Sequence, residues 1–503
     1  MSVSEIGGSL PRSWCLVGFE DALKIASDEG KRIPQSDYLE GGALPVIDQG
    51  EAFIGGYTNK LDAQYAGPLP LIVFGDHTRR VKYVEQRFAV GAQGVKLLVP
   101  TGAFAARYLA YLVPVLPLPD RGYSRHFQFL RNMQFPMPPR AEQDRIVAEI
   151  EKQFTRLDAA VAALKRVQAN LKRYRAAVLK AACEGRLVPT EAELARKEGR
   201  SYETGEQLLA RILKERRAKW ETDQLAKMHA AGKPPKDDDW KRKYKQPVDP
   251  DKTDTPCIPD GWAIASMDQL TTRITSGSRD WSSYYTREDG SIFIMAQNVR
   301  PGRLDLSFRQ YVRPPVDDPS KSRSQIEPDD LLVTIVGANT GDVCRVTELL
   351  PEHYVCQSVA LMRPVFPPVS GFLNTYMNSD ENGQRQYRRY IYGAGRPHLD
   401  FEQLKMTPIL LPPLSEQSRI GDEIERRLST LAEVESEIQA NLTRANRLRQ
   451  SILKRAFEGK LVPQDPNDEP ASVLLERIRA ERAANKPKTR IVAGKKAKTI
   501  ATA

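Results

Sequence analysis

The sequence predicts an α+β fold in which two globular domains of mixed, mainly β character alternate with two long helices, the second half of the chain repeating the first. The hexapeptide EGRLVP at 184–189 recurs as EGKLVP at 458–463, 274 residues later. Before each copy, apolar residues fall three or four positions apart, which indicates one buried stripe on a helix. Elsewhere, short β-branched and aromatic runs separated by Gly and Pro indicate strands and turns.

The first globular domain is expected at 1–140 and the second at 258–412. The segments GPLPLIVFGD and VKLLVP in the first domain, and DLLVTIVG and VALMRPV in the second, have the composition of buried strands. A turn also recurs, since LIVFGDHTRRVKYV at 71–84 aligns with VTIVGANTGDVCRV at 333–346. The shared positions are Gly75, Thr78, Val81 and Val84 in the first turn and Gly337, Thr340, Val343 and Val346 in the second. The two domains are therefore predicted to be divergent copies of one fold.

A helical arm and a following helix are predicted at 141–228, and a second such pair at 413–485. Each arm begins after a Pro-Pro pair, in PPRAEQDRI at 138–146 and in PPLSEQSRI at 412–420, and ends at the glycine of the repeated hexapeptide. Proline disfavours helix in the residue before it, and glycine commonly ends a helix. Each arm is therefore expected to be one helix of about 45 residues, roughly 65 Å long.

The spacing of apolar residues in both arms is close to the period of a coiled coil. Two helices that each carry one stripe most simply bury those stripes against each other. The alternative is that each arm packs on its own globular domain. The predicted interface consists of Ile150, Phe154, Leu157, Val161, Leu164, Leu171 and Val178 in the first arm and Ile424, Leu428, Leu431, Ile438, Leu442 and Ile452 in the second.

The net charge of +11 suggests an anionic partner, but more than half of that charge lies in one segment. The tail at 486–503 has six basic residues and no acidic one, and it is predicted to be disordered. The charged, Pro-rich stretch at 229–257 is predicted to be a linker or a surface excursion. Because the globular part is only mildly basic, a nucleic-acid site would have to concentrate its charge locally.

The composition argues against several classes of protein. The five cysteines show no paired metal-ligand spacing, so we expect a reducing, cytoplasmic location and neither a disulfide scaffold nor a zinc module. No apolar run approaches the roughly 18 residues of a membrane span, so none is expected. The chain has neither a GxxxxGK(S/T) phosphate loop nor an Asn-Pro-Pro-aromatic run, so neither ATP-driven translocation nor adenine methylation is predicted for it. We predict no catalytic residue and no metal site.

The tandem of globular domain, long helix, globular domain and long helix resembles the specificity subunit of type I restriction-modification enzymes. The resemblance extends over about residues 10–485, and its most specific parts are PPLSEQSRI and EGKLVP with their first copies and the two aligned turns. It implies that each globular domain is a target recognition domain for one half of a split sequence in double-stranded DNA. It also implies that the arms pair antiparallel, space the two domains and dock two copies of a DNA adenine methyltransferase subunit, which restriction and translocase subunits then join.

The resemblance also implies that this chain is not an enzyme. It would hold no cofactor, and S-adenosylmethionine, ATP and Mg would belong to the partner subunits. The geometry suits this role, because half-sites on one face of B-DNA lie about 34 Å apart, or a multiple of that, and two rigid helices can span such a distance. The rival functions are a scaffold that binds only proteins, a DNA-binding regulator without modification partners, and a nuclease built from scattered Asp, Glu and Lys.

Candidate DNA contacts are polar and basic side chains on loops between strands. In the first domain they are His77, Thr78, Arg79, Arg80 and Lys82 in the turn, and Arg121, Tyr123, Arg125 and His126 in the later loop DRGYSRHF. In the second domain they are Asn298, Arg300, Asn339 and Thr340, and Arg385, Arg388, Arg389, Tyr392, Arg396 and His398 in RQYRRYIYGAGRPH. The alternatives are that the threonines only shape their turns, that the histidines cap or pack, and that the arginines are ordinary solvated surface.

Overall fold

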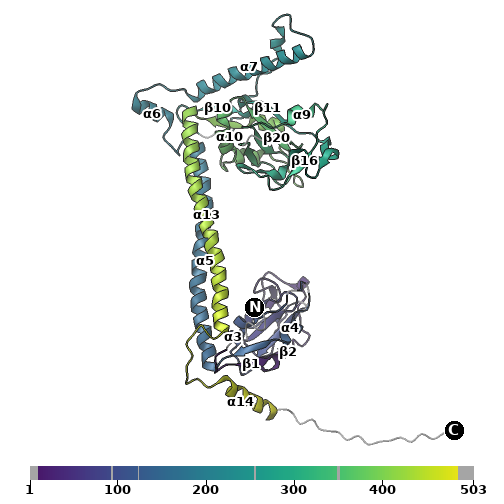
Figure 1. Ribbon diagram of the computed structural model, residues 1–503, viewed down its shortest axis with the longest axis vertical. Helices are drawn as coiled ribbons and strands as arrows, with labels where there is room; N and C mark the ends of the chain where they lie inside the picture. The colour runs from purple at the N-terminus through teal and green to yellow at the C-terminus, as the bar shows by residue number, and fades with distance from the viewer. Residues whose placement is uncertain are drawn as a thin grey trace, which may run out of the picture. The chain divides into compact units, whose positions relative to one another are not determined.

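The computed structural model describes residues 10–91, 94–119, 121–122, 124–253, 257–347 and 352–484. These residues form two compact units. The first unit runs up to Lys165 and resumes at Gln439, whereas the second comprises Arg166–Ile438. Both units combine helices with β-sheets, so the predicted α+β class is confirmed (Figure 1).

The first globular domain contains the strands β1 (Cys15–Gly18), β2 (Leu23–Ala26), β3 (Leu44–Ile47), β4 (Gly56–Thr58), β5 (Leu71–Gly75), β6 (Val81–Val84), β7 (Ala89–Val90), β8 (Val95–Pro100) and β9 (Gln134–Met137) and the helices α2 (Phe19–Ala22), η1 (Gln35–Asp37), η2 (Leu61–Ala63), α3 (Ala106–Leu112), η3 (Val113–Val115) and α4 (Phe127–Arg131). Its main sheet is antiparallel in the order β2-β8-β5-β6. β5 is buried along its whole length, as its uninterrupted apolar run predicts. A smaller sheet, β4-β3-β7, shares a core with it, in which Ile47 packs with Val73 and Val95.

The second globular domain contains the strands β10 (Ala263–Ser266), β11 (Thr271–Ser276), β12 (Tyr285–Thr286), β13 (Ser291–Ile294), β14 (Val299–Arg300), β15 (Arg303–Leu304), β16 (Gln310–Val312), β17 (Leu331–Thr334), β18 (Val343–Arg345), β19 (His353–Val355), β20 (Val359–Pro364) and β21 (Pro408–Leu411). Its helices are α8 (Met267–Leu270), η5 (Asp280–Tyr284), η6 (Ala296–Asn298), α9 (Ser320–Ser324), η7 (Pro367–Val369), α10 (Ser370–Met377), α11 (Gly383–Tyr390) and α12 (Phe401–Met406). The two largest sheets run β11-β20-β17-β18 and β12-β16-β13-β19.

The two domains have corresponding topologies. The order β2-β8-β5-β6 in the first matches β11-β20-β17-β18 in the second, and the terminal pair β1-β9 matches β10-β21. Even the parallel pairing recurs, between β3 and β7 and between β13 and β19. The predicted duplication therefore holds at the level of the fold, although the sequence matches between the domains are sparse.

Each arm is one helix of 44 residues, α5 (Arg140–Cys183) and α13 (Leu414–Phe457), or about 66 Å of rise. In the first unit, Ile150 at the start of α5 shares a core with Ile452 near the end of α13. In the second unit, Val178 near the end of α5 shares a core with Ile424 near the start of α13. The helices therefore pack antiparallel within each unit, as predicted (Figure 1).

Both arrangements considered for the arms occur, at different places along them. The helix ends pack into the domain cores, and the ion pairs Arg449–Asp158 in the first unit and Arg175–Glu435 in the second join one helix to the other. All thirteen residues predicted to form the interface are buried or half-buried.

The repeated arm signatures form the joints between arm and domain. Trp14 Nε1 donates to Glu142 Oε2 at 2.9 Å, and Trp262 Nε1 donates to Glu416 Oε1 at 3.0 Å. Both carboxylates are fully buried, and burial raises the pKa of each. The EQ pair shared by PPRAEQDRI and PPLSEQSRI is therefore explained by a duplicated structural contact rather than by exposure to a partner.

The helices after the first arm belong to the second unit, and the helix after the second arm belongs to the first unit. After α5, the helices α6 (Glu191–Glu198), α7 (Gly205–Ala230) and η4 (Asp239–Lys243) belong to the second unit, where Leu208 of α7 packs in the domain core. After α13, helix α14 (Ala471–Ala484) belongs to the first unit, where Leu475 is buried in that core and Arg479 pairs with Asp21 at 2.5 Å. Each compact unit therefore contains the start of one arm and the end of the other.

The described part of the predicted linker at 229–257 is a surface excursion, which leaves α7 and returns to the second domain. Trp240 stacks on Trp220 of α7 with ring centroids 5.9 Å apart, and Tyr244 packs edge-on against the same ring. Val248 N donates to Asp268 Oδ2 at 2.8 Å, which returns the chain to the second domain. The predicted tail at 486–503 lies outside the described residues.

Candidate nucleic-acid interface

In the first domain, the candidate surface centres on the turn between β5 and β6. Two backbone hydrogen bonds close the turn, from Gly75 N to Arg80 O and from Arg79 N to Gly75 O, each 2.8 Å long. Thr78 Oγ1 donates to Gln49 O at 2.8 Å, which ties the turn to the chain after β3. The hairpin thus presents Thr78 and Arg80 to solvent while its base is fixed.

A buried carboxylate joins this turn to His126 and Phe127, at the end of the later loop. Asp76 is 6% exposed, and its Oδ1 accepts a hydrogen bond from Phe127 N at 2.8 Å. Its carbonyl oxygen accepts another from His126 N at 2.8 Å. Arg121 and Arg125 precede these two residues in the chain and are exposed. The structure therefore joins the turn to the end of the loop that the sequence indicated as a second candidate segment.

The second domain builds the corresponding surface from other residues. Its turn lies between β17 and β18, and Gly337 N donates to Pro397 O at 3.1 Å. Thr340 Oγ1 donates to the same oxygen at 3.1 Å. Gln384 Nε2 of α11 donates to Gly341 O at 2.8 Å. The turn and the predicted basic-aromatic segment at 385–398 therefore form one continuous surface.

Five side chains of the basic-aromatic segment are exposed, namely Arg385, Arg388, Arg389, Tyr392 and Arg396. Arg388 pairs with Asp380 at 3.4 Å, a solvent-exposed contact of a kind that contributes little to stability. Tyr392 stacks on His398 with ring centroids 5.8 Å apart, and its hydroxyl donates to Asp400 Oδ1, a hydrogen bond that raises the pKa of the tyrosine. The segment thus offers guanidinium groups next to an exposed aromatic ring.

Three of the predicted DNA-contact residues have buried side chains and do not lie on the exposed surface. Lys82 is 6% exposed and donates to Ala52 O at 2.6 Å, and desolvation lowers its pKa although Asp48 lies 3.3 Å away. His126 is 1% exposed, with Nδ1 3.1 Å from Asp76 O. Asn298 is 1% exposed and donates to Asp305 O and Phe308 O. These residues hold loops in place.

The remaining predicted positions are half-buried or outside the described part. His77, Arg79, Arg300, Asn339, Thr340 and His398 are half-buried. Arg300 lies near Asp342. Burial raises the pKa of the Asp342 carboxyl, and the positive charge of Arg300 offsets part of that rise. The hydroxyls of Thr78 and Thr340 are engaged with backbone carbonyls, as the turn-shaping alternative expects. Tyr123 lies outside the described residues.

Sequence reasoning missed the residues that hold these surfaces together. Gln49 and Gln384 each bind the backbone of a recognition turn, and neither is basic or aromatic. For Gln49 the signal was its recurrence as Gln297, 248 residues later. For Gln384 no such signal existed, because α11 has no helical counterpart among the described residues of the first domain.

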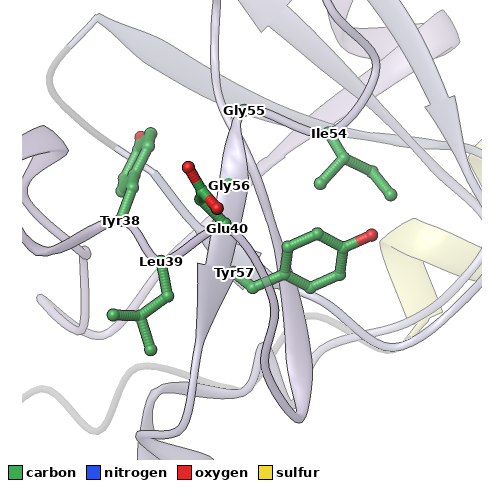
Figure 2. A pocket seen from close by; sticks show the side chains of 7 residues that line it. All are labelled: Tyr38, Leu39, Glu40, Ile54, Gly55, Gly56 and Tyr57. Atoms are coloured by element: carbon green, nitrogen blue, oxygen red, sulfur yellow. The ribbon is translucent and has the colours of Figure 1, made fainter.

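A pocket of about 500 Å³ lies elsewhere on the first domain, along strand β4. Its lining is mainly aliphatic and aromatic, with Leu39, Ile54 and Tyr57 around one carboxylate, Glu40 (Figure 2). None of the predicted DNA-contact residues lines it.

Within the described ranges, no group of three or more His, Cys, Asp or Glu side chains is placed to hold a metal ion. In that same part of the chain, none of the helices combines the length and apolar composition that crossing a bilayer requires.

No protein-family model matches the chain. The EcoBI specificity subunit of the type I restriction enzyme from Escherichia coli is 27% identical over 370 residues, which cover 71% of this chain and 66% of that subunit. The StySPI specificity subunit from Salmonella potsdam is 29% identical over 180 residues, covering 33% of this chain and 39% of that one. In sequence, the chain is similar to the specificity subunits of type I restriction enzymes.

The chain shares its fold with a solved chain from a study of complex assembly and conformational transition in the type I R-M system. The two superpose with a TM-score of 0.58 at 15% identity, over 90% of this chain and 100% of the other. The sequence matches span just under two thirds of the EcoBI specificity subunit and well under half of the StySPI one. The duplicated domains and paired arms of this chain thus have a counterpart in a solved fold.

Proposed function

We propose that this chain is a specificity subunit of a type I restriction enzyme and binds double-stranded DNA at a split target, with the first domain contacting one half-site and the second domain the other. The observation that carries the proposal is the duplicated composite surface. In each domain, the turn after an equivalent strand is fastened to a later loop that exposes arginines. The residues at the exposed positions differ between the two surfaces, as recognition of two different half-sites requires.

The chemistry of these surfaces suits DNA. Arginine can donate two parallel hydrogen bonds to guanine O6 and N7 in the major groove, and it also neutralises phosphates. The second surface combines Arg385, Arg389 and Arg396 with the exposed ring of Tyr392. A scaffold that binds only proteins would not need such a concentration of positive charge in a domain whose residues 258–412 include 16 Lys and Arg but 18 Asp and Glu.

The arms would act as spacers and docking elements. A helix of 44 residues provides about 66 Å, enough to separate half-sites by one or two turns of B-DNA. The two duplicated arm regions would give a partner two similar attachment surfaces, so we expect two copies of a DNA adenine methyltransferase subunit on one specificity subunit. Restriction and translocase subunits would join this core. Methyl transfer and cleavage, with S-adenosylmethionine, ATP and Mg, would then belong to the partners.

The test compares two triple substitutions that remove the same charge from the second unit. Arg388→Gln, Arg389→Gln and Arg396→Gln alter the candidate surface. Lys241→Gln, Arg242→Gln and Lys243→Gln alter the surface excursion after α7 and serve as the control. Binding is measured at one fixed salt concentration with the full target and with targets in which either half-site is scrambled.

The surface triple variant is expected to lose selectivity for one half-site by about 5- to 150-fold if even one of its arginines contacts a base. Selectivity for the other half-site should remain, because the first domain is unchanged. The control variant should weaken binding little and without preference for either half-site. Equal behaviour of the two variants would favour a protein scaffold and contradict DNA recognition by this surface.

A further inference from the structure

A pocket of about 400 Å³ lies in the second unit, between α7, the surface excursion that follows it and strand β11. Its volume is in the range of small-molecule sites, roughly 300–1,000 Å³. None of the predicted DNA-contact residues lines it. The lining that matters below comes from all three segments and includes Trp220, Asp223, Lys243, Tyr244, Lys245 and Thr272. We call it the excursion pocket.

A second layer of side chains holds the aromatic wall of this pocket. Trp240, which does not line the pocket, stacks on the Trp220 ring with centroids 5.9 Å apart. Tyr244 meets the same indole edge-on at 5.3 Å, and its hydroxyl accepts a hydrogen bond from Arg216 Nη1 at 2.8 Å. Arg216 is anchored in turn, since its Nε donates to Thr271 O at 3.0 Å. The two rings are therefore fixed before any ligand binds, which favours binding.

These contacts explain how the excursion is fastened to α7, but they do not explain two cations of the pocket. The segment KRKYK at 241–245 has four basic residues. Lys241 and Arg242 do not line the pocket, and each pairs with an aspartate three positions earlier, at 2.9 and 3.4 Å. Lys243 and Lys245 do line it and are exposed, and no ion pair joins either of them to a carboxylate of the described residues.

The other charges of the pocket do not neutralise these two lysines. Lys219 pairs with Glu215 at 3.0 Å and donates to Val365 O. Asp223 is exposed, and within the described ranges it forms no ion pair, although it lines the same pocket as the lysines. The pocket therefore presents two unpaired ammonium groups, one unpaired carboxylate and two fixed aromatic rings.

We propose that the excursion pocket binds a nucleoside phosphate. Lys243 and Lys245 bind the phosphate, for which lysine is a common point-charge partner. Asp223 accepts hydrogen bonds from the ribose hydroxyls, as acidic residues do in dinucleotide sites, and Trp220 and Tyr244 contact the flat base. A bound nucleotide joins α7, the excursion and β11, so it stabilises the second unit. This site goes beyond the proposed recognition of DNA and does not depend on it.

The test is titration calorimetry of the full chain with AMP, ATP, GMP and GTP, and with adenosine and inorganic phosphate as partial ligands. At least one nucleotide should bind more tightly than either partial ligand and raise the thermal midpoint. Lys243→Gln combined with Lys245→Gln should weaken that binding by about tenfold or more, because charge-assisted hydrogen bonds are lost. Asp223→Asn should reduce the preference for the ribonucleotide over its 2′-deoxy form.

The control combines Lys241→Gln with Arg242→Gln, which removes the same charge from the same segment outside the pocket. Its nucleotide affinity should equal that of the wild type. Without nucleotide, both double variants should unfold like the wild type, since they change side chains at the surface of the excursion.

Four results would overturn the inference. No nucleotide might bind at millimolar concentration, or the two double variants might lose affinity equally, which would indicate a general effect of charge. Inorganic phosphate that binds as tightly as every nucleotide would leave only a simple anion site. A short DNA duplex that displaces the nucleotide, and whose affinity falls by the same factor in the pocket variant, would assign the lysines to the DNA backbone.

Discussion

Substituting Gly459 tests how the end of an arm is joined to a domain. Gly459 has φ +71° just after α13, where Lys460 N donates to Arg455 O and closes the helix. A β-carbon there would lie 2.4 Å from Pro11 Cγ and 2.7 Å from its Cδ. Gly459→Ala therefore combines an unfavourable backbone conformation with a collision against a proline of the first domain.

The magnitude follows from two contributions. The left-handed conformation costs alanine about 1–2 kcal/mol. Displacing a packed side chain costs about 1–3 kcal/mol more. Gly459→Ala should thus lower the free energy of unfolding by about 2–5 kcal/mol. Gly185→Ala, whose β-carbon would lie 2.9 Å from Pro259 Cγ, should behave similarly in the second unit. Gly199→Ala is the control, because Gly199 has φ +66° with nothing within 4 Å, and it should cost only about 1–2 kcal/mol.

The assay is chemical or thermal unfolding of the three variants, with a further variant that combines Gly459→Ala and Pro11→Ala. Removing the proline ring should recover part of the loss in the double variant, since the collision is gone while the backbone cost stays. If Gly459→Ala destabilised the chain no more than Gly199→Ala, the close packing of the repeated hexapeptide against the domain would be refuted.

Two further predictions concern the arms and their joints. Ile438→Ala in the buried interface should lower the free energy of unfolding by about 2–5 kcal/mol. Leu448→Ala, at a side chain that is 49% exposed, should change it little. Unfolding measurements that gave the two variants equal losses would contradict the assigned interface. Burial raises the pKa of Glu416 above its ordinary value of 4.5, so the contribution of this carboxyl to stability is present below pH 4.5 and is lost as the pH rises through the raised value. Relative to the wild type, Glu416→Gln should therefore become more stable as the pH increases from 4.5 toward 7, and a pH-independent difference in unfolding would contradict a buried, titrating carboxyl.

Periodicity made the arms predictable from the sequence. Apolar residues every three or four positions over some 40 residues allow few structures, and the helix limits follow from local proline and glycine signals. The topology of the domains could be anticipated only as two copies of one fold. The strand pairing depends on contacts between residues far apart in the sequence, and so does the packing of α7 in the second domain and of α14 in the first.

The candidate surfaces were predictable in location but not residue by residue. A turn and a basic loop could each be recognised by composition, and the structure joins them. Lys82 and His126 have residue types that suit DNA contacts. In the structure, however, Lys82 is buried beside Asp48 and His126 is buried beside Asp76. Burial of a polar group depends on a partner brought close by the tertiary fold, which neither composition nor spacing reveals.

The most direct test of the central claim is to exchange one recognition domain and map the modified DNA. Residues 258–412 are replaced by the corresponding domain of another specificity subunit, and methylated adenines are mapped across the genome of cells that carry the partner methyltransferase with either chain. We predict a split target in which only one half changes while the other half and the spacing stay the same. A change in both halves, or an unchanged target, would contradict the assignment of one half-site to each domain.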